Sequence, residues 1–243
     1  MNIEDAMSGK YSFYKDPVLA MASYQEFGFH VEKDFFTSEY CDFLIAEGNN
    51  LSGARAGNFK PALMPHIENS VFFDVMKERK TVDVIGKLVD GTPVGIQTQF
   101  FYCKPGTRGF SLHQDNFYVE AGDGCFASVW IGLVDTIPLN GGMIVYPGSH
   151  KEGNLPVRKL NLSLDPKQDR NANNEETEVP AKYSPHHLSL SRGSALFIHA
   201  YLVHGSNSNQ SDSSRYAVLN LYLKQGEKFR SGNSAQRQPL ALT

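Results

Sequence analysis

Residues 95–119 read GIQTQFFYCKPGTRGFSLHQDNFYV, and this stretch decides the fold prediction. Its first nine residues alternate and are rich in aromatic and β-branched side chains. Residues 104–107 have turn composition, and residues 110–119 return to strand composition. We therefore expect two strands joined by a turn, near residues 95–103 and 111–119.

The second of these predicted strands carries a candidate metal site. His113 and Asp115 are two residues apart, so on a strand both side chains point to the same face and can hold one ion. A His-x-Asp pair alone is a weak signal, and its strand context gives it weight. His204, at the end of another predicted strand, supplies a distant third ligand. Two imidazoles and one carboxylate leave open positions on Fe(II), which is typical of non-haem iron oxygenases.

The other histidines are expected to be structural. His199 lies five residues before His204, on the opposite pleat if the strand is continuous. His150 follows a Pro-Gly-Ser turn, so we expect it to hydrogen-bond at the corner rather than to bind iron. His186 and His187 are neighbours and face opposite sides of a strand, so they cannot share an ion.

Arg215 is a candidate for binding an anionic co-substrate. Fe(II), the Asp115 carboxylate and a dianionic 2-oxo acid together carry excess negative charge. The far carboxylate of the 2-oxo acid therefore needs a cation. The planar fork of arginine suits a bidentate carboxylate contact. Because Arg215 opens the last predicted strand, a rigid element could aim it inward.

The strand pattern predicts a mainly β fold with flanking helices. Eight short strands separated by turn residues indicate a double-sheet jelly roll. They lie near residues 95–103, 111–119, 125–134, 142–147, 187–191, 194–199, 201–204 and 215–223.

The chain of 243 residues is expected to form one domain, 1–243, with a jelly-roll core over about 93–225. Residues 17–92 mix helical and loop signals and should buttress the sheet, with helices over Ser38–Gly48, capped at Thr37 or Ser38, and over 74–89. The interval 151–183 is very polar and is either a lid or disordered. The tail, 228–243, is expected to be loose.

Composition excludes several classes of partner. The net charge is −3 and no run of Lys or Arg exceeds two residues, which argues against nucleic acid. No segment approaches the ~20 apolar residues of a membrane span, and the N-terminus lacks the pattern of a secretion signal, so we expect a cytoplasmic protein. Three scattered cysteines, Cys41, Cys103 and Cys125, indicate reduced core residues rather than disulfides or a zinc site.

Three further groups of residues carry a family resemblance. They are residues 112–116 (LHQDN), residues 130–150 with Trp130 and NGGMIVYPGSH, and residues 192–206 with RGSALFIH and HGS, followed by Arg215. In this order and spacing, over roughly residues 20–225, the chain resembles the phytanoyl-CoA dioxygenase family of Fe(II)/2-oxoglutarate oxygenases.

The resemblance implies a double-stranded β-helix in which His113, Asp115 and His204 bind iron and Arg215 binds the distal carboxylate of 2-oxoglutarate. It also implies that further side chains surround the co-substrate, namely Trp130, Ser206, Gln99 and Tyr102. Halogenases that resemble this fold have a small residue at the position of Asp115, so a carboxylate there favours hydroxylation, although desaturation and cyclisation use the same ligands.

The predicted function is therefore a dioxygenase that uses Fe(II), 2-oxoglutarate and O2, with ascorbate as an activator, on a small metabolite or natural-product intermediate. An acyl-CoA substrate is disfavoured because the chain has no basic cluster for a nucleotide diphosphate. We expect a monomer or homodimer. Two alternatives are a cupin-like metal enzyme that is not an oxygenase and a catalytically silent jelly roll that binds a small molecule.

Overall fold

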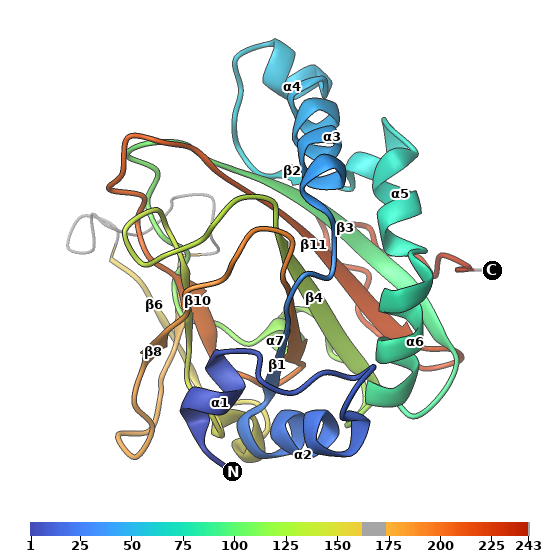
Figure 1. Ribbon diagram of the computed structural model, residues 1–243, viewed down its shortest axis with the longest axis vertical. Coiled ribbons are helices and arrows are strands. Elements are labelled where there is room, and N and C mark those ends of the chain that lie inside the picture. The colour runs from blue at the N-terminus through green and yellow to red at the C-terminus, as the bar shows by residue number, and fades with distance from the viewer. Residues whose placement is uncertain (162–173, 243) are drawn as a thin grey trace.

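The computed structural model describes residues 1–161 and 174–242, and its framework is two facing β-sheets (Figure 1). The larger sheet is antiparallel and six-stranded. Its order is β1 (Phe29–Glu32), β9 (Ala195–His199), β4 (Phe126–Gly132), β11 (Arg215–Lys224), β3 (Pro93–Cys103) and β2 (Ala62–Leu63).

The smaller sheet has the order β10 (His204–Ser206), β5 (Met143–Val145) and β8 (His186–His187). Paired backbone hydrogen bonds between His113 and His204 extend it beyond β10. A separate hairpin of β6 (Val157–Lys159) and β7 (Glu175–Thr177) continues this side, because the Thr177 N–H donates to the Leu112 carbonyl. The result is the predicted jelly roll.

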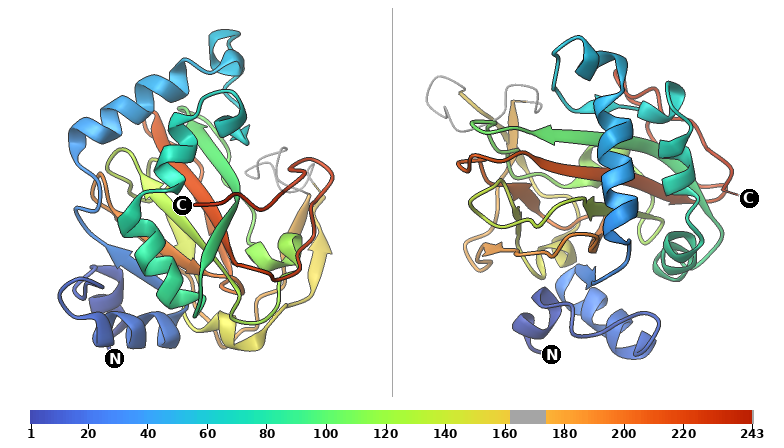
Figure 2. Two further views of the ribbon diagram at one scale, coloured as in Figure 1. Left: turned by 90° about the vertical axis from the view of Figure 1, so that its right-hand side faces the viewer. Right: turned by 45° about the horizontal axis from the view of Figure 1, so that its top comes forward.

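Helices cover the outer face of the large sheet and one end of the molecule (Figures 1 and 2). Helices α3, α5 and α6 pack on the sheet around a large apolar cluster that includes Phe72, Val84, Phe100 and Tyr222. The helices are α1 (Ile3–Met7), α2 (Pro17–Phe27), α3 (Ser38–Asn49), α4 (Ser52–Arg55), α5 (Val71–Met76), α6 (Arg79–Leu88) and α7 (Asp115–Val119), with 3-10 turns η1 (Pro65–Ile67) and η2 (Ser149–Glu152).

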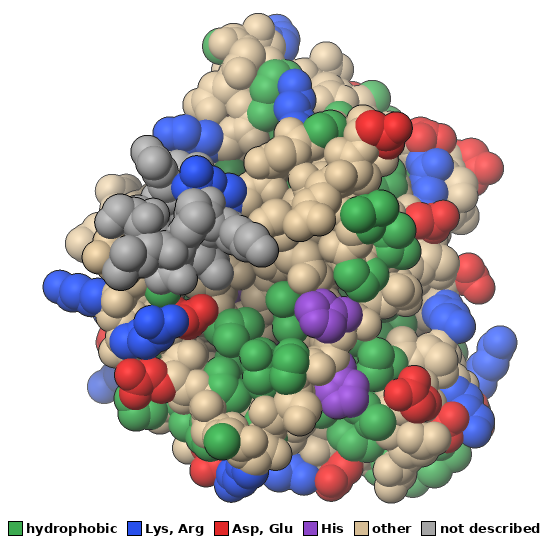
Figure 3. Space-filling model, turned by 90° about the vertical axis from the view of Figure 1, so that its left-hand side faces the viewer, with side chains coloured by type: hydrophobic (Ala, Val, Ile, Leu, Met, Phe, Trp, Pro, Cys, Tyr) green, Lys and Arg blue, Asp and Glu red, His purple; other side chains and the backbone are tan. Residues whose placement is uncertain are grey.

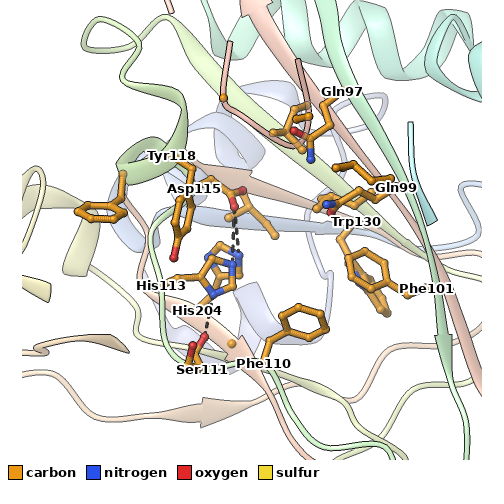
Figure 4. Close-up of a pocket in the computed structure, with 18 of the residues that line it drawn as sticks. Gln97, Gln99, Phe101, Phe110, Ser111, His113, Asp115, Tyr118, Trp130 and His204 are labelled. Carbon is orange, nitrogen blue, oxygen red and sulfur yellow. Dashed lines mark hydrogen bonds and ion pairs between the residues drawn. The ribbon is translucent and has the colours of Figure 1, made fainter. Parts of the chain in front are cut away.

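The alternation of β3 separates the core from the cavity. Phe100 and Tyr102 face the helices, whereas Gln97, Gln99 and Phe101 face the space between the sheets. Figure 4 shows these last three side chains on one face of the strand. Strand β3 therefore contributes apolar side chains to the core on one face and lines the cavity with the other.

Two N-terminal predictions fare differently. The helix at 38–48 is confirmed, and the Thr37 hydroxyl caps it by accepting from the Tyr40 N–H at 3.2 Å. The helix expected over 74–89 is confirmed for most of its length but is divided in two, because α5 ends at Met76 and α6 starts at Arg79. Strand β1 was not predicted, and it completes the sheet by pairing with β9.

Several predicted strands differ at their ends. The expected strand at 201–204 is instead a turn that leads into β10. Of the expected 187–191 strand only residue 187 lies in β8, which starts one residue earlier, at His186. The expected strand at 111–119 is also wrong, because its second half is helix α7.

The C-terminal tail, which was expected to be loose, makes specific contacts with β3. Leu240 pairs with Gly95 of β3 through two backbone hydrogen bonds of 2.8 and 3.0 Å. Arg237 is 9% exposed and its Nε donates to Gln97 Oε1. Hydrogen bonds therefore connect this polar segment to the sheet.

Much of the candidate lid, at 162–173, lies outside the described residues. None of the helices within 1–161 and 174–242 is long and apolar enough to cross a membrane. On the face shown in Figure 3, Lys and Arg side chains are interspersed with Asp and Glu around the rim, so its charges are of mixed sign.

Candidate active site

The three predicted ligands meet at a cavity of about 780 Å³ between the two sheets. His113 Nε2 and His204 Nε2 lie 3.7 and 3.8 Å from Asp115 Oδ1, and the two imidazole centroids are 4.3 Å apart. One ligand atom from each residue lies within 4.8 Å of the others (Figure 4). This spacing suits a single ion bound by all three side chains.

Asp115 reaches this point from a helix and not from a strand. It is the first residue of α7, and Gln114 before it is extended. The Gln114 amide donates to the carbonyls of Gly153 and Tyr201, and Asn116 exchanges two hydrogen bonds with Ala121. The local Asn116–Ala121 bonds favour a turn over a continued strand, and the long-range Gln114 bonds hold the chain at the bend through which His113 and Asp115 converge.

The backbone fixes both imidazoles in the same way. His113 Nδ1 lies 2.8 Å from the Ser111 carbonyl, and His204 Nδ1 lies 3.0 Å from the Leu202 carbonyl. Because a carbonyl can only accept, each Nδ1 carries a proton and each Nε2 presents its lone pair to the cavity. Both rings are therefore oriented as metal ligands.

Ser128 of β4 orients the carboxylate. Its hydroxyl donates to Asp115 Oδ2 at 2.6 Å in a buried setting, which leaves Oδ1 facing the two Nε2 atoms. Sequence reasoning missed this residue, and its only signal was one hydroxyl within an otherwise apolar stretch of β4. A residue that hydrogen-bonds to a metal ligand in this way typically increases the affinity of the site for its metal.

Burial, with a smaller contribution from neighbouring His204, lowers the pKa of His113 to about 4. The imidazole is therefore neutral near pH 7, and a metal ion does not have to displace a proton from Nε2.

Arg215 lies in the same cavity and is 3% exposed. Its guanidinium carbon is 5.7 Å from the centre of the Trp130 ring, and its Nε has no hydrogen-bond partner within residues 1–161 and 174–242. Burial lowers the pKa of this guanidinium. A buried cation without a carboxylate partner among those residues is costly, so the site is suited to an anionic ligand.

The structure places three of the four expected co-substrate neighbours at the cavity. Trp130, Ser206 and Gln99 line it, and the Ser206 hydroxyl also accepts from the Phe110 N–H at 3.0 Å. Tyr102 differs from the expectation, because it is absent from the lining of this cavity and its hydroxyl donates to the Gly48 carbonyl beneath α3. The alternation of β3 turns Tyr102 to the helix side.

His150 and His199 are structural, as expected. His150 Nε2 lies 3.0 Å from the Gln25 carbonyl, and its ring is 4.8 Å from that of His199. Neither residue lines the cavity.

Aromatic side chains complete the cavity wall. Phe101, Phe110, Phe117 and Tyr118 line it, whereas Phe72 belongs to the core under the helices. Arg237 and Gln97 also line it and were not predicted.

The family model for phytanoyl-CoA dioxygenase matches residues 24–217, most of the chain. The chain belongs to this family. Within it, the chain is 31% identical over 147 residues to a phytanoyl-CoA dioxygenase of Arabidopsis thaliana, covering 60% of this chain and 50% of that protein. It is 26% identical over 211 residues to an ectoine dioxygenase of Streptomyces anulatus, covering 81% and 67%.

The chain thus spans about half the length of the first of these relatives. Among solved structures, the non-haem alpha-ketoglutarate-dependent carbocyclase SnoK from nogalamycin biosynthesis matches with a TM-score of 0.71. The match covers 91% of this chain and 89% of SnoK at 15% identity. This likeness confirms the predicted fold class.

Proposed function

We propose that the protein is an Fe(II)/2-oxoglutarate-dependent dioxygenase that hydroxylates an unactivated C–H bond of a small metabolite or natural-product intermediate. The observation that carries the proposal is that the His113, Asp115 and His204 ligand atoms share one cavity with a buried Arg215 that has no carboxylate partner within residues 1–161 and 174–242.

The residues present fit both groups. Two imidazoles and one carboxylate on one side of an ion suit Fe(II) and leave the cavity side open. Because two of those open positions can take a 2-oxo acid, its far carboxylate needs a cation, and Arg215 is the residue that would pair with it. When bound, the iron and 2-oxoglutarate supply the oxidation, by coupling decarboxylation to succinate with transfer of an oxygen atom from O2.

The chain's own residues position and protect that reaction. Ser111 and Leu202 hold the imidazoles, Ser128 holds the carboxylate, and the aromatic wall excludes water from the reacting carbon. Trp130 packs against the Arg215 guanidinium and restricts its direction. The carboxylate of Asp115 would be one of the iron ligands, in place of the small residue of related halogenases, which favours hydroxylation.

A cavity of about 780 Å³ is in the range of pockets that enclose small molecules. The relatives act, by their names, on substrates as different as phytanoyl-CoA and ectoine, so kinship alone does not choose between them. The cavity size supports a small substrate.

The test is succinate formation by the purified protein with Fe(II), 2-oxoglutarate, O2 and ascorbate. We expect succinate from the wild type and from His187→Ala, an exposed histidine outside the cavity, and none from His113→Ala. If the wild type binds a metal but never turns over 2-oxoglutarate, a cupin-like enzyme of another reaction is favoured. If the wild type binds neither a metal nor 2-oxoglutarate, a catalytically silent binding module is favoured.

A further inference from the structure

The C-terminal segment, residues 226–242, lies beyond the residues that the family model matches and forms part of the cavity wall. Figure 2 shows it returning past α7 and ending beside α5 and α6. The pairing of Leu240 with Gly95 anchors its far end on β3. This chain therefore completes its cavity with a segment that is not part of the matched family core.

Arg237 is the residue that this segment delivers to the cavity. Its Nε donates to Gln97 Oε1 at 2.6 Å, and its Nη1 donates to the carbonyls of Tyr118 and Arg230 at 3.1 and 3.3 Å. A guanidinium has five N–H donors, so these three bonds fix its plane and leave the two on Nη2. Across residues 1–161 and 174–242, Nη2 makes no hydrogen bond of its own.

A second arginine, Arg230, lies in the same segment, but its charge is already paired. Arg230 donates from Nε and Nη2 to the carbonyls of Tyr118 and Phe117, and its Nη1 pairs with Glu120 at 2.9 Å. Its charge is therefore already matched by a carboxylate, whereas within the described chain no ion pair is found for Arg237.

The co-substrate leaves Arg237 available to another anion. The cavity lining holds three arginines, at positions 215, 230 and 237, and Arg230 is already paired with Glu120, which lies outside the lining. The two carboxylates of 2-oxoglutarate go to the metal and to Arg215, which leaves Arg237 without a co-substrate partner.

The two arginines reach the cavity from different elements. Arg215 begins β11 and pairs in register with Cys103 of β3, whereas Arg237 is held from the C-terminal segment by Gln97, six residues back along β3. The triad lies at the Arg237 end, because Ser128, which holds Asp115, pairs with Leu221, the partner of Gln97.

We propose that Arg237 binds an oxyanion, a carboxylate or a similar group, on the substrate, so that the C-terminal segment determines specificity for small anionic molecules. This rests on the proposed function above. A guanidinium whose plane is fixed before binding loses little entropy when an oxyanion pairs with it, and burial strengthens the pair.

The test measures binding of a panel of small carboxylic acids, each beside its neutral primary amide, by anaerobic calorimetry with Fe(II) and saturating 2-oxoglutarate. Three variants are compared: Arg237→Gln, Arg237→Lys and Lys228→Gln, which removes an exposed charge from the same segment outside the cavity. We expect acids to bind in preference to amides, and Arg237→Gln to weaken their binding by about tenfold to a hundredfold. Lys228→Gln should change nothing, and Arg237→Lys should retain the preference for acids, which separates lost charge from a disturbed segment.

Equal binding of acids and amides, failure of every acid to bind, or unchanged acid binding by Arg237→Gln would overturn the proposal. The binding of Fe(II) and 2-oxoglutarate by Arg237→Gln should match that of the wild type. Their failure to bind to the wild type would instead overturn the proposed function, and with it the premise of this inference.

Discussion

The Ser128 hydroxyl donates a 2.6 Å hydrogen bond to Asp115 Oδ2, and this contact turns the other carboxylate oxygen, Oδ1, toward His113 and His204. It joins β4 of the large sheet to the start of α7, so the sheet itself orients the carboxylate ligand. The metal site is thereby built across the sandwich and not within one loop.

Replacing Ser128 with Ala should weaken Fe(II) binding by about 10- to 100-fold, because Asp115 loses the partner that orients it. Anaerobic Fe(II) titration measures this. Ser23→Ala is the matched control, since the Ser23 hydroxyl is buried without a hydrogen-bond partner among the described residues. Equal Fe(II) affinity of Ser128→Ala and the control would show that the contact does not support the site.

Arg215→Gln should leave Fe(II) binding intact and weaken 2-oxoglutarate binding by about tenfold or more, because a buried charge-assisted pair is lost. Calorimetry of 2-oxoglutarate with the Fe(II)-loaded protein separates the two effects. Arg79→Gln, whose side chain is 92% exposed on α6, serves as the control. Unchanged 2-oxoglutarate affinity in Arg215→Gln would remove this residue from the co-substrate site.

Gly28→Ala should destabilise the protein by more than about 1 kcal/mol, since Gly28 has φ of +79° and an added Cβ would lie 2.4 Å from His150 Nδ1. Gly57→Ala is the matched control, because Gly57 has φ of +77° but nothing within 4 Å of an added Cβ. Urea unfolding measures both. Equal losses would mean that backbone strain alone, and not the contact with His150, requires glycine at position 28.

The metal-free protein should lose stability as the pH falls from 7 to 5. Burial, with the charge of neighbouring His150, lowers the pKa of His199 to about 4, and the pKa of His150 is also lowered by burial. An unfolded histidine has a pKa near 6.5, so over this range the unfolded chain binds protons that the folded chain does not. One such group costs up to about 2 kcal/mol at pH 5.

Urea unfolding at both pH values measures that loss, and His199→Gln should flatten the dependence. A wild-type free energy of unfolding that is the same at pH 7 and pH 5 would contradict the assignment of neutral, buried histidines.

The sequence predicted the ligands because they fall at motif positions, and it predicted the jelly roll because its strands alternate. The sequence could not predict that Asp115 reaches the metal site from the start of a helix. His-x-Asp spacing fits a strand equally well, and the turn depends on Gln114 meeting the carbonyls of Gly153 and Tyr201, which are distant in sequence. The family resemblance implied both Gln99 and Tyr102 beside the co-substrate, but the two lie on opposite faces of β3 and only Gln99 lines the cavity.

The contacts of the C-terminal tail depend on distant residues for a related reason. Its composition is polar, which is usual in loose segments, but Arg237 is hydrogen-bonded to Gln97, 140 residues earlier, and to the carbonyls of Tyr118 and Arg230. Ser128 was missed in the same way, since one hydroxyl in an apolar strand has no meaning until its partner is known. Local patterns reveal ligands, whereas the residues that orient them depend on contacts between distant segments.

The most direct test of the central claim is calorimetric titration of 2-oxoglutarate into the anaerobic protein with and without Fe(II). We predict binding to the Fe(II)-loaded wild type, and loss of that binding when the metal is omitted or when His113 or His204 is replaced by Ala. Absence of 2-oxoglutarate binding by the Fe(II)-loaded wild type, or binding that does not depend on these two histidines, would contradict the account.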